Sequence, residues 1–413
     1  MAVFQAFKAL RPTSEKAAAV AALPYDVVNR EEARQIGEKN QLSFLHVDRA
    51  EMDLEPDIDL YDKRVYDKAR ENLQNMEKEG ILIQDDTPCY YIYELVRKGR
   101  TQSGIVGCSS IDDYMNGIVK KHELTREDKE QDRIHHVDSC NANTGPIFLA
   151  CRYPQSLLAL MEQWKAEHPA AYDFTEEDEV AHRVWVIDAP EVTAQICEEF
   201  AGIDSLYIAD GHHRAASAVK VGLKRREENP GFTGKEEFNF FLSVVFPYDQ
   251  LCILPYNRVV KDLNGLTVKA FLGALKFNFE LMLMPGFPCK PVEKHCMGMY
   301  VDGQWYHLKA WQDVYDKKDV VEQLDVSILQ DKVLSPVLGI KDPRTDQRIS
   351  FVGGNHKAAE LARMADQTGG VAFVMYPTSM EDLMQIADEG RLMPPKSTWF
   401  EPKLRSGLFI HKL

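Results

Sequence analysis

The stretch 206–214 carries the residues of this chain best suited to chemistry. Leu206–Ala209 is an apolar run typical of a strand, and Ala215–Val219 is a small-residue run typical of a helix. Between them stands Asp210–Arg214, an acid, a glycine, two histidines and an arginine. A helix that begins there directs its first free N–H groups, and the positive end of its dipole, at whatever lies above the turn. The pattern predicts a site for a phosphate or another anion.

Each residue of this stretch is assigned a role by its chemistry. Gly211, His213 and Arg214 are predicted to bind a phosphate or a nucleotide, because they combine a close backbone approach with positive charge. Asp210 is a candidate metal ligand or proton acceptor, and His212 a candidate acid or phosphoryl acceptor. Asp-Gly corners and single histidines are often only structural. Two histidines beside an arginine are poor choices for a plain turn.

Other loop-like stretches carry more polar chemistry than connecting loops need. A carboxylate beside a histidine and two lysines can act as a general base if it is partly buried, so Glu123 is the first candidate. Asp26, in a proline-fixed corner before a helix, is the second candidate. The remaining side chains are predicted to bind substrate or phosphate. The substrate candidates are Tyr25, Asp26, His122 and Asn143, and the further phosphate candidates are Lys396, Ser397 and Thr398.

Several standard catalytic and metal motifs do not occur in the sequence. It contains no GxSxG and no HExxH, and Gly353-Gly354 lacks the spacing of a dinucleotide fingerprint or a P-loop. The 8 cysteines include no CxxC pair, which indicates reduced thiols. Cys289, His295 and Cys296 are irregularly spaced and lack a fourth ligand, so they do not predict a structural zinc site.

Composition limits the classes of partner. The chain has 413 residues with 45% hydrophobic and 27% charged residues, as expected of a globular protein of two domains or of one large elaborated domain. Its formal charge of −15 argues against broad binding to nucleic acid or to anionic membranes. No run approaches the roughly 20 apolar residues of a membrane span. We therefore expect a cytoplasmic protein whose partners are a small-molecule substrate and a nucleotide, and leave open a homo-oligomer.

Short apolar runs alternate with helical patterns, which predicts a mixed α/β fold with a second α+β region. We expect a first domain over 1–262, carrying the Asp-Gly-His-His-Arg site, and a second over 263–413. The charged segment 126–139 suits an exposed helix. The other expected helices are 29–39, 61–79, 268–277, 320–330, 356–365 and 380–387. The expected strands are 147–150, 184–187, 206–209, 240–245 and 371–375, with hairpins turning at Lys98-Gly99 and Asp302-Gly303.

The motifs together resemble the DUF1015 family, a family named for its unknown function. The resemblance runs over 23–29, 43–47, 121–123, 208–214, 256–260 and 393–408. A more distant similarity links Gly211 and Arg214 to the Gly-X-X-Arg phosphate corner of the ParB/sulfiredoxin superfamily. That superfamily includes ParB-like free serine kinases, which use an upstream glutamate as base. The resemblance implies a ParB/sulfiredoxin-like phosphate-binding core. The histidines replace the sulfiredoxin cysteine, which argues against sulfinic-acid reduction.

The function favoured by these residues is a nucleotide-dependent phosphotransferase acting on a small metabolite, with free serine or phosphoserine as the leading candidate. The expected cofactors are Mg²⁺ and ATP or ADP, with Asp210 holding the metal and Glu123 deprotonating the acceptor. Two alternatives remain open. The same site could act as a phosphatase through His212, or the protein could be a nucleotide-sensing switch without fast turnover.

Overall fold

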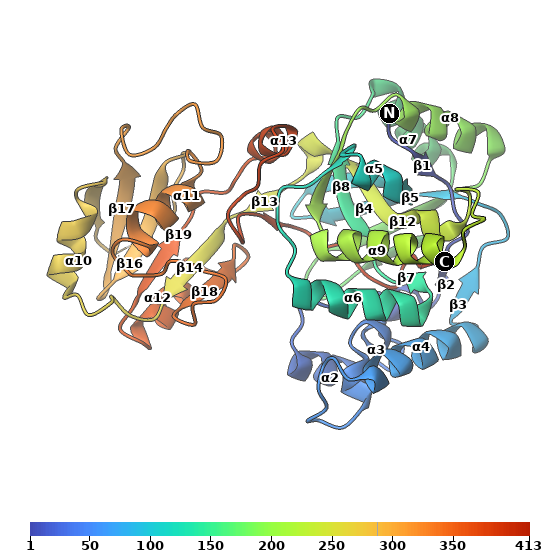
Figure 1. Cartoon of the computed structure of the whole chain (residues 1–413), viewed down its shortest axis with the longest axis horizontal. Helices are drawn as coiled ribbons and strands as arrows, with labels where there is room; N and C mark the ends of the chain where they lie inside the picture. Colours follow the sequence, from blue (N-terminus) through green and yellow to red (C-terminus); the bar gives the residue numbers. More distant parts are fainter. Residues whose placement is uncertain (287) are drawn as a thin grey trace. The chain divides into compact units, whose positions relative to one another are not determined.

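The computed structural model describes residues 1–286 and 288–413. The chain forms two compact units, which are described in turn. The larger unit comprises 1–121, 125–251 and 402–413, and the smaller comprises 252–401 with the short segment 122–124. Both units mix helices with sheets, so the predicted mixed α/β class is confirmed (Figure 1). Among the described residues, no helix combines the length and apolar character that crossing a membrane requires.

The larger unit is built on a mixed sheet in the order β6-β11-β8-β12-β5-β4-β10-β9, with β1 beside β5. β11 runs parallel to β6 and antiparallel to β8, and β8 runs parallel to β12. The strands are β1 (Phe4–Gln5), β4 (Tyr90–Arg97), β5 (Arg100–Ser110), β6 (Val119–Lys120), β8 (Ile147–Cys151), β9 (Tyr172–Thr175), β10 (Ala181–Ile187), β11 (Leu206–Asp210) and β12 (Phe240–Pro247).

Two apolar cores hold the larger unit together. One joins the sheet to helices on its surface, with Ile208 of β11 and Ala215 of α9 both fully buried in it. The other lies among the N-terminal helices and includes Leu45 and Leu73. The helices are α1 (Ala17–Val20), α2 (Arg30–Lys39), α3 (Leu45–Asp48), α4 (Lys63–Lys78), α5 (Ile111–Met115), α6 (Glu127–Cys140), α7 (Gln155–Glu167), α8 (Pro190–Ala201) and α9 (His212–Glu228).

Local sequence signals explain several boundaries. α2, the helix expected over 29–39, begins with a capping box, in which Asn29 and Glu32 bond each other's backbone N–H groups. The β4–β5 hairpin turns at Lys98 and Gly99, which have φ of 50° and 75°, the left-handed geometry that two-residue hairpin turns need. Both elements were expected from sequence, and the structure confirms them.

The prediction for 126–139 is right about the helix and wrong about its exposure. α6 packs against α9 on one side and α4 on the other, as Figure 1 shows. Its Asp132, Arg133 and His136 are buried. Buried charges are tolerated there because they are paired: the Nε of Arg133 donates to Asp132 at 3.0 Å, and Tyr66 donates its hydroxyl to Asp132 at 3.1 Å.

The C-terminal segment 402–413 returns to the larger unit. His411 and Lys412 form β21, which pairs antiparallel with β7 (Ala142–Asn143), and Ile410 bridges to Leu10. Leu10 belongs to β2 (Leu10–Pro12), which pairs with β3 (Leu82–Gln84). The last residues of the chain are therefore part of the same unit as the Asp-Gly-His-His-Arg stretch.

The smaller unit contains an antiparallel sheet in the order β15-β17-β16-β19-β14-β18. Its core includes Leu361 and Ala365 of α12. The β16–β17 hairpin turns at Asp302-Gly303, as expected. The elements are β13 (Ile253–Leu254), β14 (Tyr256–Val260), β15 (Phe279–Met284), β16 (Cys296–Val301), β17 (Gln304–Ala310), β18 (Ile349–Gly353), β19 (Val371–Val374), β20 (Trp399–Phe400), α10 (Val268–Leu275), α11 (Asp325–Leu329) continued by a π-helix (Gln330–Leu334), α12 (Ala358–Asp366) and α13 (Met380–Asp388).

Candidate functional site

The Asp-Gly-His-His-Arg stretch forms the corner between a buried strand and a long helix. β11 ends at Asp210, Gly211 is the N-cap of α9, and His212 is the first helical residue. Gly211 has φ of 93°, a left-handed conformation that glycine adopts without the strain a side chain would bring. The chain therefore reverses in one residue, and the first N–H groups of α9 point out of the corner.

Arg214 folds back over this corner. A Cβ added at Gly211 would lie 3.0 Å from its Nε, so the absence of a side chain at Gly211 makes room for the guanidinium. One NH group of Arg214 also donates to the carbonyl of Pro146. The guanidinium is held at the start of α9, where its charge adds to the helix dipole.

Asp210 is held by two donors. Its Oδ1 accepts from the N–H of Gly211 at 2.8 Å, and its Oδ2 accepts from the Nζ of Lys403 at 2.8 Å. Burial by itself would raise the pKa of Asp210, but the nearby cations Lys403 and Arg214 outweigh it and hold that pKa well below its usual range. Asp210 is therefore an ionised carboxylate, the form that a metal ligand needs.

The two histidines of the corner differ in their surroundings. His213 accepts a hydrogen bond on Nε2 from the backbone N–H of Arg126 at 3.0 Å. His212 is buried at the first turn of α9. The hydrogen bond between His213 and Arg126, the N-cap of α6, connects α9 to the start of α6.

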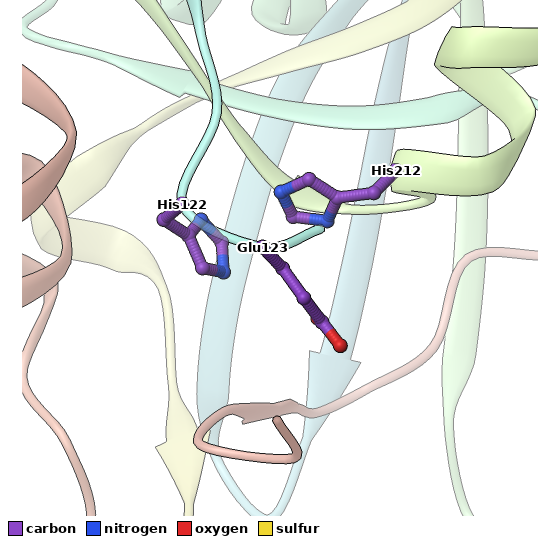
Figure 2. A group of neighbouring side chains, drawn as sticks. All are labelled: His122, Glu123 and His212. Atoms are coloured by element: carbon purple, nitrogen blue, oxygen red, sulfur yellow. The ribbon is translucent and has the colours of Figure 1, made fainter. Parts of the chain in front are cut away.

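Three side chains that could hold a metal ion are drawn in Figure 2. One ligand atom from each of His122, Glu123 and His212 lies within 4.8 Å of the others. His122 and Glu123 follow β6, which pairs with β11 in parallel, and His212 begins α9. Two imidazoles and one carboxylate suit a transition metal better than Mg²⁺, which prefers oxygen ligands. A carboxylate in such surroundings can also accept a proton.

Tyr25, Asn143 and Arg214, far apart in sequence, line one pocket of the larger unit. The sequence did not predict buried charges in this pocket, because the polar sequence pattern of α6 is typical of a solvent-exposed helix. The guanidinium of Arg133 lies 4.0 Å from the centre of the Tyr25 ring, a cation–π contact. The other lining residues are Asp48, His136, Val137, Thr144, Gly145, Ile147, Ser217 and Ala218.

Three of the predicted substrate residues, Asn143, Asp26 and His122, have surroundings that the sequence did not predict. The amide oxygen of Asn143 accepts from the backbone N–H of Leu242 at 3.1 Å, so Asn143 also braces β7 against β12. Asp26 lies exposed in a turn of the loop before α2. His122 is buried, and its carbonyl accepts from the N–H of Met393 at 2.8 Å.

The predicted Lys-Ser-Thr group lies in the smaller unit. Lys396 has φ of 58°, and its ammonium lies 5.6 Å from the centre of the Tyr256 ring. The hydroxyl of Ser397 donates to the carbonyl of Pro394 at 2.6 Å and braces this turn. Thr398 precedes the short strand β20. A cation in contact with the Asp-Gly-His-His-Arg corner is Lys403, which was not singled out from the sequence alone, although it lies within 393–408, one of the ranges that resemble the family.

Among the described residues, the set His122, Glu123 and His212 is the one group that could hold a metal ion. The irregularly spaced cysteines are not part of it. Cys296 instead donates its thiol to Glu293 at 3.7 Å, and His295 bonds the hydroxyl of Tyr315 at 2.9 Å. The absence of a structural zinc site at Cys289, His295 and Cys296 thus stays a prediction, with local contacts for two of the three side chains.

Solved structures that match this chain share little sequence with it. A mutant of free serine kinase in complex with AMP is 13% identical, with a TM-score of 0.37, over 77% of this chain and 92% of that one. A conserved hypothetical protein from Pyrococcus furiosus is 15% identical, with a TM-score of 0.36, over 76% and 96%. SbnI from Staphylococcus aureus, truncated at its C-terminus, is 11% identical, with a TM-score of 0.37, over 74% and 86%.

No curated protein sequence matches the chain. The family described as "Protein of unknown function (DUF1015)" matches residues 4–327. That range includes the whole Asp-Gly-His-His-Arg corner and most of the sequence of 413 residues. The chain belongs to the DUF1015 family.

Proposed function

We propose that this protein is a nucleotide-dependent phosphotransferase that binds a nucleotide phosphate at the amino terminus of α9. The observation that carries the proposal is the guanidinium of Arg214 folded over Gly211, where the first N–H groups of α9 emerge. Backbone donors, a helix dipole and a fixed guanidinium form the combination by which proteins bind phosphate. In a chain of formal charge −15, such a local cationic site has a specific purpose.

The chemistry of the transfer is assigned by role. Phosphoryl transfer needs charge neutralisation on the phosphate, a divalent cation and a group that orients or deprotonates the acceptor. We assign neutralisation to Arg214, the cation to Mg²⁺ with Asp210 as ligand, and deprotonation to Glu123. Mg²⁺, when bound with ATP or ADP, supplies charge stabilisation at the transferring phosphate. His212 is the acid or phosphoryl acceptor if the site works as a phosphatase instead.

The acceptor class we propose is a small metabolite with a hydroxyl group, with free serine or phosphoserine as the first compounds to test. The pocket lined by Tyr25 and Arg214 is also lined by the buried guanidinium of Arg133 and by the buried carboxylate of Asp48. A pocket with both charges suits a small molecule that carries both charges, as an amino acid does.

The first experiment measures nucleotide binding. ATP and ADP are titrated into the wild type by calorimetry, with and without Mg²⁺, and into Arg214→Ala. We expect the variant to lose about 1.5–3 kcal/mol of binding free energy, the scale of charge-assisted hydrogen bonds. The control is Arg64→Ala, which removes an arginine with 59% side-chain exposure on α4. Equal affinity in wild type and a folded Arg214→Ala rules out the phosphate site.

The second experiment separates transfer from sensing. ATP or ADP consumption is measured with and without serine, phosphoserine and a panel of other hydroxylated metabolites. Turnover that depends on an acceptor supports the phosphotransferase. Release of phosphate from phosphoserine without a nucleotide supports the phosphatase. Tight nucleotide binding with no turnover under any of these conditions rejects both reactions and leaves the sensing role.

A further inference from the structure

Lys403 reaches the Asp-Gly-His-His-Arg corner from the far end of the chain. Its ammonium lies 2.8 Å from Oδ2 of Asp210, the last residue of β11. The side chain of Lys403 is 12% exposed, so its charge is largely withdrawn from water. Withdrawing a lysine ammonium from water is costly unless a partner or a function compensates for it. Asp210 is one such partner, and it stands one residue before the N-cap of α9.

The backbone around Lys403 is fixed by its neighbours. The side chain of Arg405 is 1% exposed and lies 2.6 Å from both Glu176 and Asp178. Its NH1 group donates to the carbonyl of Lys403 at 3.1 Å. The N–H of Ser406 donates to the carbonyl of Ala22 at 2.9 Å. Because the backbone is held here and the ammonium is bonded to Asp210, Lys403 presents its ammonium at a defined place.

Lys403 changes the net charge of the Asp-Gly-His-His-Arg corner. Without it, the charges of Asp210 and Arg214 cancel, and an incoming phosphate would meet the ionised carboxylate of Asp210. With Lys403 present, the three side chains carry one net positive charge. An ammonium has three N–H donors in a flexible arrangement, so it can bond to a carboxylate and to phosphate oxygens at the same time. The corner then suits an anion with two or more phosphates.

We propose that Lys403 is a phosphate-binding residue of the site at the amino terminus of α9, and that Asp210 positions its ammonium there. The proposal rests on the proposed function, because it requires that a phosphate binds at this corner. The proposal assigns a binding role to the C-terminal segment 402–413, whose other contacts, such as the pairing of β21 with β7, are structural. A purely structural Lys403, which only neutralises Asp210, is the competing explanation.

The test uses the full chain and two probes, pyrophosphate and ADP, titrated by calorimetry. Pyrophosphate isolates the phosphate contacts from those of the base and sugar. We expect Lys403→Met to weaken pyrophosphate binding by about 10- to 100-fold, the scale of a lost charge-assisted hydrogen bond. Lys403→Arg should keep most of the affinity, because it keeps the charge. The control is Lys63→Met, which removes an ion pair of the same type, 2.6 Å from Asp67, with 85% side-chain exposure.

The double variant Lys403→Met with Asp210→Asn distinguishes the two explanations. If Lys403 only neutralises Asp210, removing both charges restores the affinity of the wild type, and that result overturns the proposal. If Lys403 binds phosphate, the double variant stays about 10-fold or more weaker than Asp210→Asn alone. The melting temperature of each variant identifies losses of affinity that come from unfolding. In the double variant, no carboxylate at position 210 is left without the lysine that paired with it.

The controls also separate this inference from the proposed function. If Arg214→Ala loses affinity for pyrophosphate while Lys403→Met does not, the phosphate site stands and the role of Lys403 is wrong. If the wild type binds neither pyrophosphate nor ADP, the phosphate site itself is wrong and Lys403 has no such role.

Discussion

The guanidinium of Arg214 lies over Gly211, at the point where a Cβ would stand 3.0 Å from its Nε. Gly211 therefore matters in two ways. Its φ of 93° lets the chain turn from β11 into α9, and its lack of a side chain leaves room for the guanidinium of Arg214. The two residues are three positions apart, one helical turn, so the arginine reaches back over its own N-cap.

Gly211→Ala tests this relationship. The left-handed backbone of an alanine costs about 1–2 kcal/mol, and its methyl group displaces the guanidinium. We expect both a lower free energy of unfolding by that amount and weaker binding of ADP, measured by denaturant titration and calorimetry. Gly231→Ala is the matched control, because Gly231 has nothing within 4 Å of an added Cβ. Wild-type affinity in Gly211→Ala would show that the placement of Arg214 is not important for binding.

Glu123→Gln tests the general base. The change keeps size and polarity but removes the proton acceptor, so acceptor-dependent turnover should fall by roughly 10²–10⁴ while ADP affinity stays close to wild type. Steady-state kinetics and calorimetry measure the two effects. Glu127→Gln, at an exposed position in the first turn of α6, is the control. Full turnover in Glu123→Gln would move the role to Asp26, the second candidate.

Asp210→Asn tests the metal ligand. An amide oxygen is a weaker ligand than a carboxylate for a hard cation, so the Mg²⁺ concentration at half-maximal activity should rise. Mg²⁺ titrations at saturating nucleotide give this value for wild type and variant. Asp210 bonds Lys403 in this structure. An unchanged Mg²⁺ requirement would therefore restrict Asp210 to positioning that lysine.

His182→Phe tests a buried histidine on β10 that stacks against Tyr93 and Phe174. Burial, with the nearby charge of Arg405, lowers the pKa of His182 from 6.5 to about 2. The unfolded chain therefore takes up a proton below pH 6.5 that the folded chain does not. Stability present above pH 6.5 is lost as the pH falls toward 2, by about 1.4 kcal/mol per pH unit.

In His182→Phe this contribution disappears. The free energy of unfolding, measured by urea titration between pH 7.5 and 4.5, should fall less steeply in the variant than in the wild type below pH 6.5. Parallel pH profiles for the two proteins would mean that His182 protonates in the folded state. The hydroxyl of Tyr93, 2.8 Å from Nδ1 of His182, loses its partner in the variant, so a uniform offset between the profiles is expected.

The elements that sequence predicted well are those with local causes. The capping box at Asn29 and the left-handed turn at Lys98-Gly99 act within a few residues, so their patterns are sufficient. The exposure of α6 was not predictable in this way. Asp132 and Arg133 are charged, and their burial is tolerable because they pair with each other and contact Tyr66 and Tyr25 of other segments.

The sequence by itself determined the Asp-Gly-His-His-Arg corner, because a strand, a glycine and a small-residue helix are set by neighbouring residues. Only the tertiary structure decided which distant residues join that corner. Lys403 stands 193 positions from Asp210, and no local pattern relates the two. Their contact depends on the buried anchor of Arg405 and on the pairing of β21 with β7. Ion pairs between distant segments follow from the packing of the whole unit, which a local pattern does not encode.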